Sequence, residues 1–239
     1  MEDPVSAAHG AVRFLPHEYR PIELTDGRVV GFATHGRPDG TSVLWCHGGP
    51  GSRMEPARLG DEAAEAGLLL IGIDRPGYGM STRCPGRTIA GWVPDALAVA
   101  DELGTTKLVA VGESTGGAYA LALAALVPDR VLGVVACCAM TDMRWEGARC
   151  TMSRPHCHAV WDAPDDRLAD GGGRVTFDVT TITCPVTVLH GEMDNMCNVV
   201  NARHTAEIVP NARLVLYDDL GHFSIVTNLI PTISDLLTR

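Results

Sequence analysis

The segment Gly-Glu-Ser-Thr-Gly over residues 112–116 most constrains the fold of this 239-residue chain. It follows an apolar run over 107–111, which predicts a buried strand, and it precedes an Ala/Leu-rich run over 118–127, which predicts a helix. A strand that passes abruptly into a helix needs a tight turn at Ser114, and glycine on either side leaves room for that turn. The pattern therefore predicts an exposed serine hydroxyl at a strand end.

The rest of the chain alternates strand and helix patterns. Residues 19–34, broken by Thr25-Asp26-Gly27, predict an antiparallel hairpin, because Asp-Gly between apolar runs favours a tight turn. The further elements that we expect are strands over 42–46, 68–73, 131–138, 186–190 and 214–217, and helices over about 56–66, 89–103 and 223–237, the last interrupted by Pro231. The apolar run over 131–138 is typical of a strand covered on both faces.

Three further segments place polar residues directly after predicted strands. His47-Gly-Gly-Pro-Gly51 follows the predicted strand over 42–46, Asp194 follows the strand over 186–190, and His222 follows the strand over 214–217. In an open parallel sheet, the carboxyl ends of the strands share one edge. Ser114, Asp194 and His222 can therefore converge there, although they lie far apart in the sequence.

With these motifs, and with Ile73-Asp-Arg-Pro-Gly-Tyr-Gly-Met-Ser81 between them, the chain resembles the α/β-hydrolase family over nearly all of its length. The resemblance implies an α/β fold: an eight-stranded, mostly parallel sheet with helices on both faces. It also implies a lid inserted after the sixth strand. The corresponding interval at about 141–180 is short, so we expect a reduced lid, and the length and composition of the chain predict a single domain over residues 1–239. That interval is rich in Cys and His and contains Gly171-Gly-Gly173.

The residue types predict nucleophilic catalysis. Ser114 is the candidate nucleophile, His222 the base that takes its proton, and Asp194 the acid that orients the imidazole. Asp142 remains an alternative acid, because it follows the strand over 131–138. The backbone N–H groups of Gly49 and Thr115 are the expected oxyanion hole.

The substrate is less constrained. The His47–Gly51 loop is similar to that of proline iminopeptidases, but those enzymes usually carry Trp where Thr115 stands and have a large lid. A serine at position 114 disfavours epoxide hydrolases and haloalkane dehalogenases, which use aspartate. We therefore expect a small-molecule ester or lactone substrate, with thioester or carbon–carbon bond cleavage still open. The alternatives are a biosynthetic acyltransferase or cyclase on the same scaffold, and a non-catalytic ligand-binding member.

Charge and composition exclude several other classes. The net charge of −10 and the lack of basic runs disfavour a nucleic-acid or membrane partner. The acidic first residues lack the apolar core of a signal peptide, and the cysteines are typical of reduced thiols, so we expect a cytoplasmic protein. The group Cys150, His156, Cys157 and His158 has no common zinc spacing, and we expect neither a metal nor a cofactor. The oligomeric state stays open.

Overall fold

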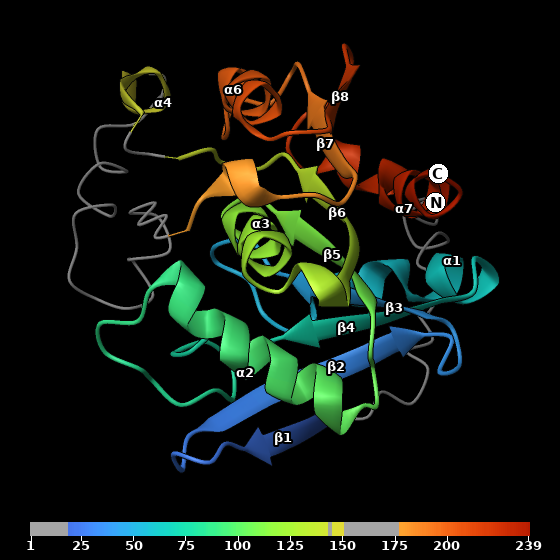
Figure 1. Cartoon of the computed structure of the whole chain (residues 1–239). Coiled ribbons are helices and arrows are strands. Elements are labelled where there is room, and N and C mark those ends of the chain that lie inside the picture. Colours follow the sequence, from blue (N-terminus) through green and yellow to red (C-terminus); the bar gives the residue numbers. More distant parts are fainter. Residues whose placement is uncertain (1–18, 143–144, 151–176) are drawn as a thin grey trace, which may run out of the picture.

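A twisted eight-stranded sheet forms the centre of the computed structural model, which describes residues 19–142, 145–150 and 177–239 (Figure 1). The strand order is β1-β2-β4-β3-β5-β6-β7-β8. The first two pairings, β1 with β2 and β2 with β4, are antiparallel, and all the others are parallel. The strands are β1 (Tyr19–Glu23), β2 (Val29–Gly36), β3 (Thr41–Cys46), β4 (Leu68–Ile73), β5 (Leu108–Glu113), β6 (Val131–Cys137), β7 (Val186–Gly191) and β8 (Ala212–Tyr217).

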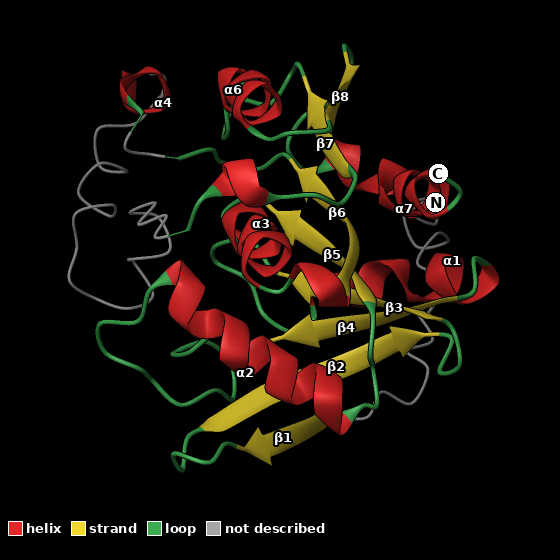
Figure 2. Ribbon diagram, in the orientation of Figure 1, coloured by secondary structure: helices red, strands yellow, loops and turns green. Residues whose placement is uncertain are grey.

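Helices cover both faces of this sheet (Figure 2). The described α-helices are α1 (Gly60–Glu65), α2 (Ile89–Glu102), α3 (Gly116–Leu126), α4 (Glu146–Cys150), α6 (Val200–Ile208) and α7 (Leu229–Leu237). Short 3-10 helices are η1 (Glu55–Leu59), η2 (Pro128–Arg130), η3 (Val179–Thr181) and η4 (Ser224–Asn228). Buried side chains of α2, α3 and α6 join one apolar core, whereas those of α1 and α7 join the other.

The central strands supply both cores by alternation. In β3, Leu44 and Cys46 face the core that contains α2 and α3, while Val43 and Trp45 face the other core. All four of these side chains are fully buried. This double burial explains the near-continuous apolar sequence of the parallel strands. Because these strands run in the same direction, their carboxyl ends lie at one edge of the sheet.

The sequence predictions of fold and strands are confirmed. The sheet has eight strands and is mostly parallel, the expected hairpin forms β1 and β2, and β4 begins and ends where predicted. Two predicted helices are shorter than expected, because their first turns are the 3-10 helices η1 and η4. Helix α6 was not predicted: it buries only Asn201, Ala202 and Thr205, so its apolar periodicity is weak.

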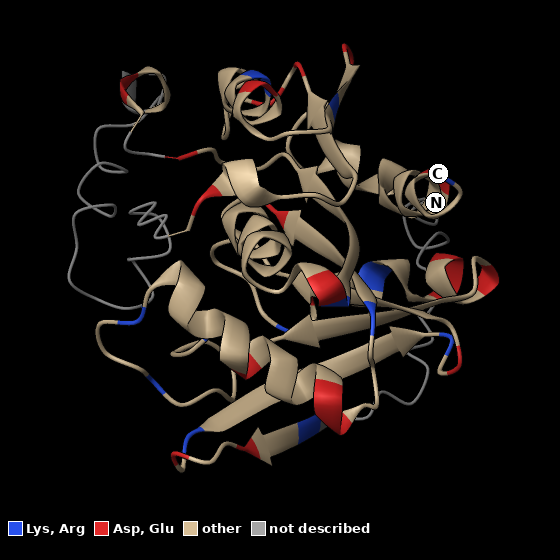
Figure 3. Cartoon of the chain, viewed as in Figure 1, with Lys and Arg blue, Asp and Glu red and all other residues tan. Residues whose placement is uncertain are grey.

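Most of the predicted lid lies outside the described residues, together with His156, Cys157 and His158. Six cysteines of the described part are free, and Cys46, Cys137, Cys138 and Cys197 are buried. In Figure 3, acidic and basic residues both occur on helices, strands and loops. Among the described helices, none has the length and apolar character needed to cross a bilayer.

Candidate active site

Ser114 occupies a sharp turn between β5 and α3. Its φ of 55° lies in the left-handed region, which a serine adopts only when the surrounding structure imposes it. A Cβ on Gly112 would lie 2.3 Å from the Gly116 carbonyl oxygen, and a Cβ on Gly116 would lie 1.9 Å from the Cys46 carbonyl oxygen. The two glycines are thus required by close backbone packing, and they hold the half-buried Ser114 at the carboxyl end of β5.

The loop that follows β3 lies against this turn. A Cβ on Gly48 would be 3.4 Å from Ser114 Cβ, and one on Gly49 would be 3.2 Å from Thr115 Oγ1. Within the described residues, the backbone N–H groups of Gly49 and Thr115 donate no hydrogen bond. Two unused donors therefore lie beside Ser114, as an oxyanion hole requires.

The conformation of this loop is held by buried charged groups. Glu55 Oε2 accepts hydrogen bonds from the Gly48 N–H and from Trp45 Nε1, both at 2.9 Å. The fully buried Arg75 donates to the carbonyl oxygens of His47 and Gly48. Glu55 thus occupies the Gly48 N–H, whereas the next amide along the chain, that of Gly49, donates no hydrogen bond within the described residues.

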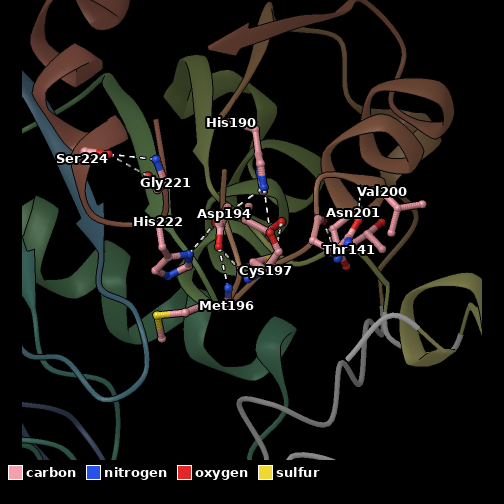
Figure 4. A network of polar contacts seen from close by, with 12 residues as sticks. Thr141, His190, Asp194, Met196, Cys197, Val200, Asn201, Gly221, His222 and Ser224 are labelled. Carbon is pink, nitrogen blue, oxygen red and sulfur yellow. Dashed lines mark hydrogen bonds and ion pairs between the residues drawn. The ribbon is translucent and has the colours of Figure 1, made fainter. Parts of the chain in front are cut away.

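Asp194 and His222 form a buried pair at the ends of β7 and β8 (Figure 4). His222 Nδ1 lies 2.7 Å from Asp194 Oδ2. The other carboxylate oxygen, Oδ1, accepts the N–H groups of Met196 and Cys197, each at 2.8 Å. The carboxylate is thus fixed by its own backbone turn and points toward the imidazole.

Two neighbours of this pair were missed by sequence reasoning. Fully buried His190 donates from Nε2 to the Cys197 carbonyl oxygen at 2.9 Å, and the same nitrogen lies 3.5 Å from Asp194 Oδ2. Cys138 comes directly after β6, and ligand atoms of Cys138, Asp194 and His222 all lie within 4.8 Å of one another. The adjacency of Cys138 to a strand end was the sequence feature that could have indicated it.

Burial and hydrogen bonds act on the pKa of His222 in opposite directions. Burial lowers it, whereas hydrogen bonds with Asp194 and Cys138 raise it, and the net pKa is raised above its ordinary value. Burial lowers the pKa of His190, so this imidazole is neutral near pH 7. His190 therefore orients the carboxylate region without adding a second positive charge.

Glu113 adds an ionisable group next to Ser114. Its carboxylate pairs with Arg58, and burial raises the pKa of Glu113 to about 7, with a further increase from the charge of Glu55. The charges of Arg58 and His222 act to lower the same pKa, but less than burial raises it.

The segment after β6 connects the serine turn with the acid–histidine pair. The Ser114 carbonyl oxygen accepts the Met140 N–H at 3.2 Å, and the Ser114 N–H donates to the Cys137 carbonyl oxygen at 3.0 Å. Cys138, within the same segment, has its Sγ within 4.8 Å of a ring nitrogen of His222. Among the hydrogen bonds of the described residues, none joins Ser114 Oγ to His222.

Asp142, the alternative acid, lies further along this segment. It lines a pocket with Thr141 and Thr205, close to His204, whose ring stacks on Trp145 at 3.8 Å. The hydrogen bond to His222 Nδ1 comes from Asp194. The arrangement thus places a serine turn, two unused amides and an imidazole–carboxylate pair along one edge of the sheet.

Comparison with known proteins agrees with this fold. A family model described as alpha/beta hydrolase fold matches residues 41–149. A 2-hydroxymuconate semialdehyde hydrolase from Pseudomonas putida is 24% identical over 242 residues, which cover 82% of this chain and 86% of that protein. A proline iminopeptidase from Neisseria meningitidis is 35% identical over 117 residues, but these cover only 48% of this chain and 37% of that protein.

Solved structures give the same result. The enol-lactonase from Burkholderia xenovorans superposes with a TM-score of 0.71 at 18% identity, covering 92% of this chain and all of the other. The chain therefore has the alpha/beta hydrolase fold. At the coarser level of function, the fold and these relatives support a hydrolase.

Proposed function

We propose that this chain is a serine hydrolase that cleaves a small-molecule ester or lactone through an acyl-enzyme intermediate. The observation that carries the proposal is the buried hydrogen bond of 2.7 Å between His222 Nδ1 and Asp194 Oδ2, at the sheet edge that also presents Ser114. A bond at Nδ1 fixes the tautomer and leaves Nε2 to accept a proton.

In the proposed reaction, Ser114 Oγ attacks the substrate carbonyl carbon while His222 takes the hydroxyl proton. The carbonyl oxygen becomes an oxyanion, which the N–H groups of Gly49 and Thr115 stabilise; each such donor lowers the barrier by about 3 kcal/mol. Collapse of the tetrahedral intermediate breaks the bond to the alkoxy oxygen, which receives the proton from His222. Water then attacks the acyl-enzyme by the same steps and releases the acid.

The relatives guide the choice of test substrates. One is named a 2-hydroxymuconate semialdehyde hydrolase and a structural neighbour an enol-lactonase, so the panel combines p-nitrophenyl esters of increasing chain length with small lactones. An alcohol acceptor added to the ester assays separates hydrolysis from acyl transfer, since a transferase forms a new ester. We expect the free acid as the main product.

Labelling with a fluorophosphonate probe tests the nucleophile itself. We expect mass spectrometry to find the adduct on Ser114, and Ser114→Ala to abolish both labelling and ester hydrolysis. Ser234→Ala, on α7, is the matched control and should leave both intact. If Ser114→Ala is still labelled by the probe or still hydrolyses the ester, the proposal is wrong.

A further inference from the structure

Thr115, the residue after the candidate nucleophile, has a side chain that the proposed reaction does not use. β3 and β5 pair in parallel with Cys46 opposite Gly112, so the chain segments that leave these two strands run side by side (Figure 1). Gly49 and Thr115 each stand three residues further along. A Cβ built on Gly49 would lie 3.2 Å from Thr115 Oγ1. The hydroxyl therefore lies against the residue that supplies the other amide of the expected oxyanion hole.

This hydroxyl does not serve the helix that it precedes. A threonine at the N-cap of a helix usually accepts a hydrogen bond from a backbone amide of the first turn. Thr115 is the N-cap residue of α3, but its φ of −60° and ψ of −25° are helical, and its side chain makes no capping hydrogen bond. The ordinary structural role of a threonine at this position is therefore not in use.

A buried cation fixes the direction of the hydroxyl proton. The fully buried Arg75 donates from Nη2 to the Gly48 carbonyl oxygen at 3.1 Å and, over a longer distance of 3.5 Å, to Thr115 Oγ1. Because a guanidinium has only donors, the Thr115 proton must point away from it. Within the described residues, Thr115 Oγ1 donates no hydrogen bond. Thr115 is only half-buried, like Ser114, so this proton can be donated to a bound molecule.

We propose that the Thr115 hydroxyl is a third donor of the oxyanion hole, beside the N–H groups of Gly49 and Thr115. The inference rests on the proposed function, since the oxyanion forms only when Ser114 Oγ attacks the substrate carbonyl carbon. As negative charge develops on the carbonyl oxygen, the Thr115 O–H donates a hydrogen bond to it, and the proton stays on Oγ1 throughout. This bond strengthens toward the transition state, so it lowers the barrier without tightening substrate binding.

Thr115→Val tests the hydroxyl, because valine has nearly the same shape and keeps the backbone amide. We expect kcat on a p-nitrophenyl ester to fall at least about tenfold, with KM unchanged. Thr115→Ser restores a hydroxyl and should keep most of the wild-type kcat. Thr106→Val, an exposed position before the opposite end of β5, is the matched control and should behave as the wild type.

A boronic acid separates this catalytic role from a structural one. Phenylboronic acid adds to a nucleophilic serine and forms a tetrahedral, negatively charged adduct that resembles the transition state. In Thr115→Val, its inhibition constant should rise by about the factor by which kcat falls. The pH midpoint of kcat/KM and the thermal unfolding should stay as in the wild type, because His222 and the helix cap are not touched. An unchanged inhibition constant, or equal losses of kcat in Thr115→Val and Thr115→Ser, would overturn the proposal.

The same assays distinguish the failure of this proposal from the failure of the proposed function. If the wild type hydrolyses no ester and is not labelled at Ser114, the proposed function fails and the third donor fails with it. If the wild type hydrolyses esters and Thr115→Val is equally active, only the third donor fails. A loss of kcat in Thr115→Val that Thr115→Ser restores supports both.

Discussion

The serine turn and the acid–histidine pair are held in place by different means. Ser114 is fixed by its backbone, through close glycine packing and through main-chain hydrogen bonds that it donates to Cys137 and accepts from Met140. Asp194 and His222 are fixed by side-chain hydrogen bonds, from backbone amides to the carboxylate and from the imidazole to the carboxylate. Changes at the turn should therefore disturb the fold, whereas changes in the pair should disturb the chemistry and leave the fold intact.

The largest effect that we expect comes from the pair. Asp194→Asn keeps the shape of the side chain but no longer fixes the productive tautomer of His222, so kcat should fall by about 10³–10⁴. Steady-state kinetics on a p-nitrophenyl ester measure this loss, and circular dichroism checks that the fold is retained. Asp219→Asn, an exposed acid three residues before His222, is the control. A fall of less than tenfold in Asp194→Asn would contradict the assigned role.

The turn should give the next largest effect, this time on stability. Gly116→Ala places a methyl group 1.9 Å from the Cys46 carbonyl oxygen, and backbone atoms must move to relieve that contact. We expect a loss of about 3 kcal/mol or more in the free energy of unfolding, measured with urea. Gly60→Ala is the matched control, since its nearest neighbour would be an ordinary 3.7 Å away. Equal stability of the two variants would show that the turn tolerates a side chain.

Glu113 lies next to Ser114 and should make the free energy of unfolding depend on pH. Its pKa is raised from 4.5 to about 7 in the folded protein, so the folded state binds more protons than the unfolded state between these values. Stability should therefore fall as pH rises from about 4.5 to 7, by an amount on the order of 2 kcal/mol. In Glu113→Gln this part of the pH dependence should be absent. Urea unfolding at several pH values checks it, and an unchanged slope in the variant would refute it.

The smallest effect that we expect is a shift in the pH dependence of kcat/KM when Cys138, the neighbour of the His222 imidazole, is changed. The wild-type kcat/KM should rise with pH as His222 loses its proton, with a midpoint above 6.5 because the pKa of His222 is raised. Cys138→Ala removes one of the hydrogen bonds that raise it, so the midpoint should move to lower pH. Cys84→Ala, with a less buried free cysteine, is the control. A midpoint that stays in place in Cys138→Ala would exclude this contact.

The sequence sufficed for the parts that depend on local pattern. Apolar runs located all eight strands, and glycine around Ser114 indicated the turn, because both follow from short-range geometry. Helix α6 escaped prediction because its buried side is small and partly polar.

The surroundings of Asp194 could not be derived from pattern in the same way. Cys138, directly after β6, comes close to the carboxylate only when β6 and β7 pair in register, whereas His190 lies on β7 itself, four residues before Asp194. The sequence also left Asp142 and Asp194 as alternatives for the acid, since both follow a strand of the sheet. Only the folded chain brings one of them to His222 Nδ1.

The central claim is that Ser114, the two amides and His222 form one catalytic centre, and the structure of a phosphonylated protein tests it most directly. We expect a covalent bond from phosphorus to Ser114 Oγ, a phosphonyl oxygen within hydrogen-bond distance of the Gly49 and Thr115 N–H groups, and His222 Nε2 facing the modified serine. An adduct on another residue, or a phosphonyl oxygen turned away from both amides, would contradict it.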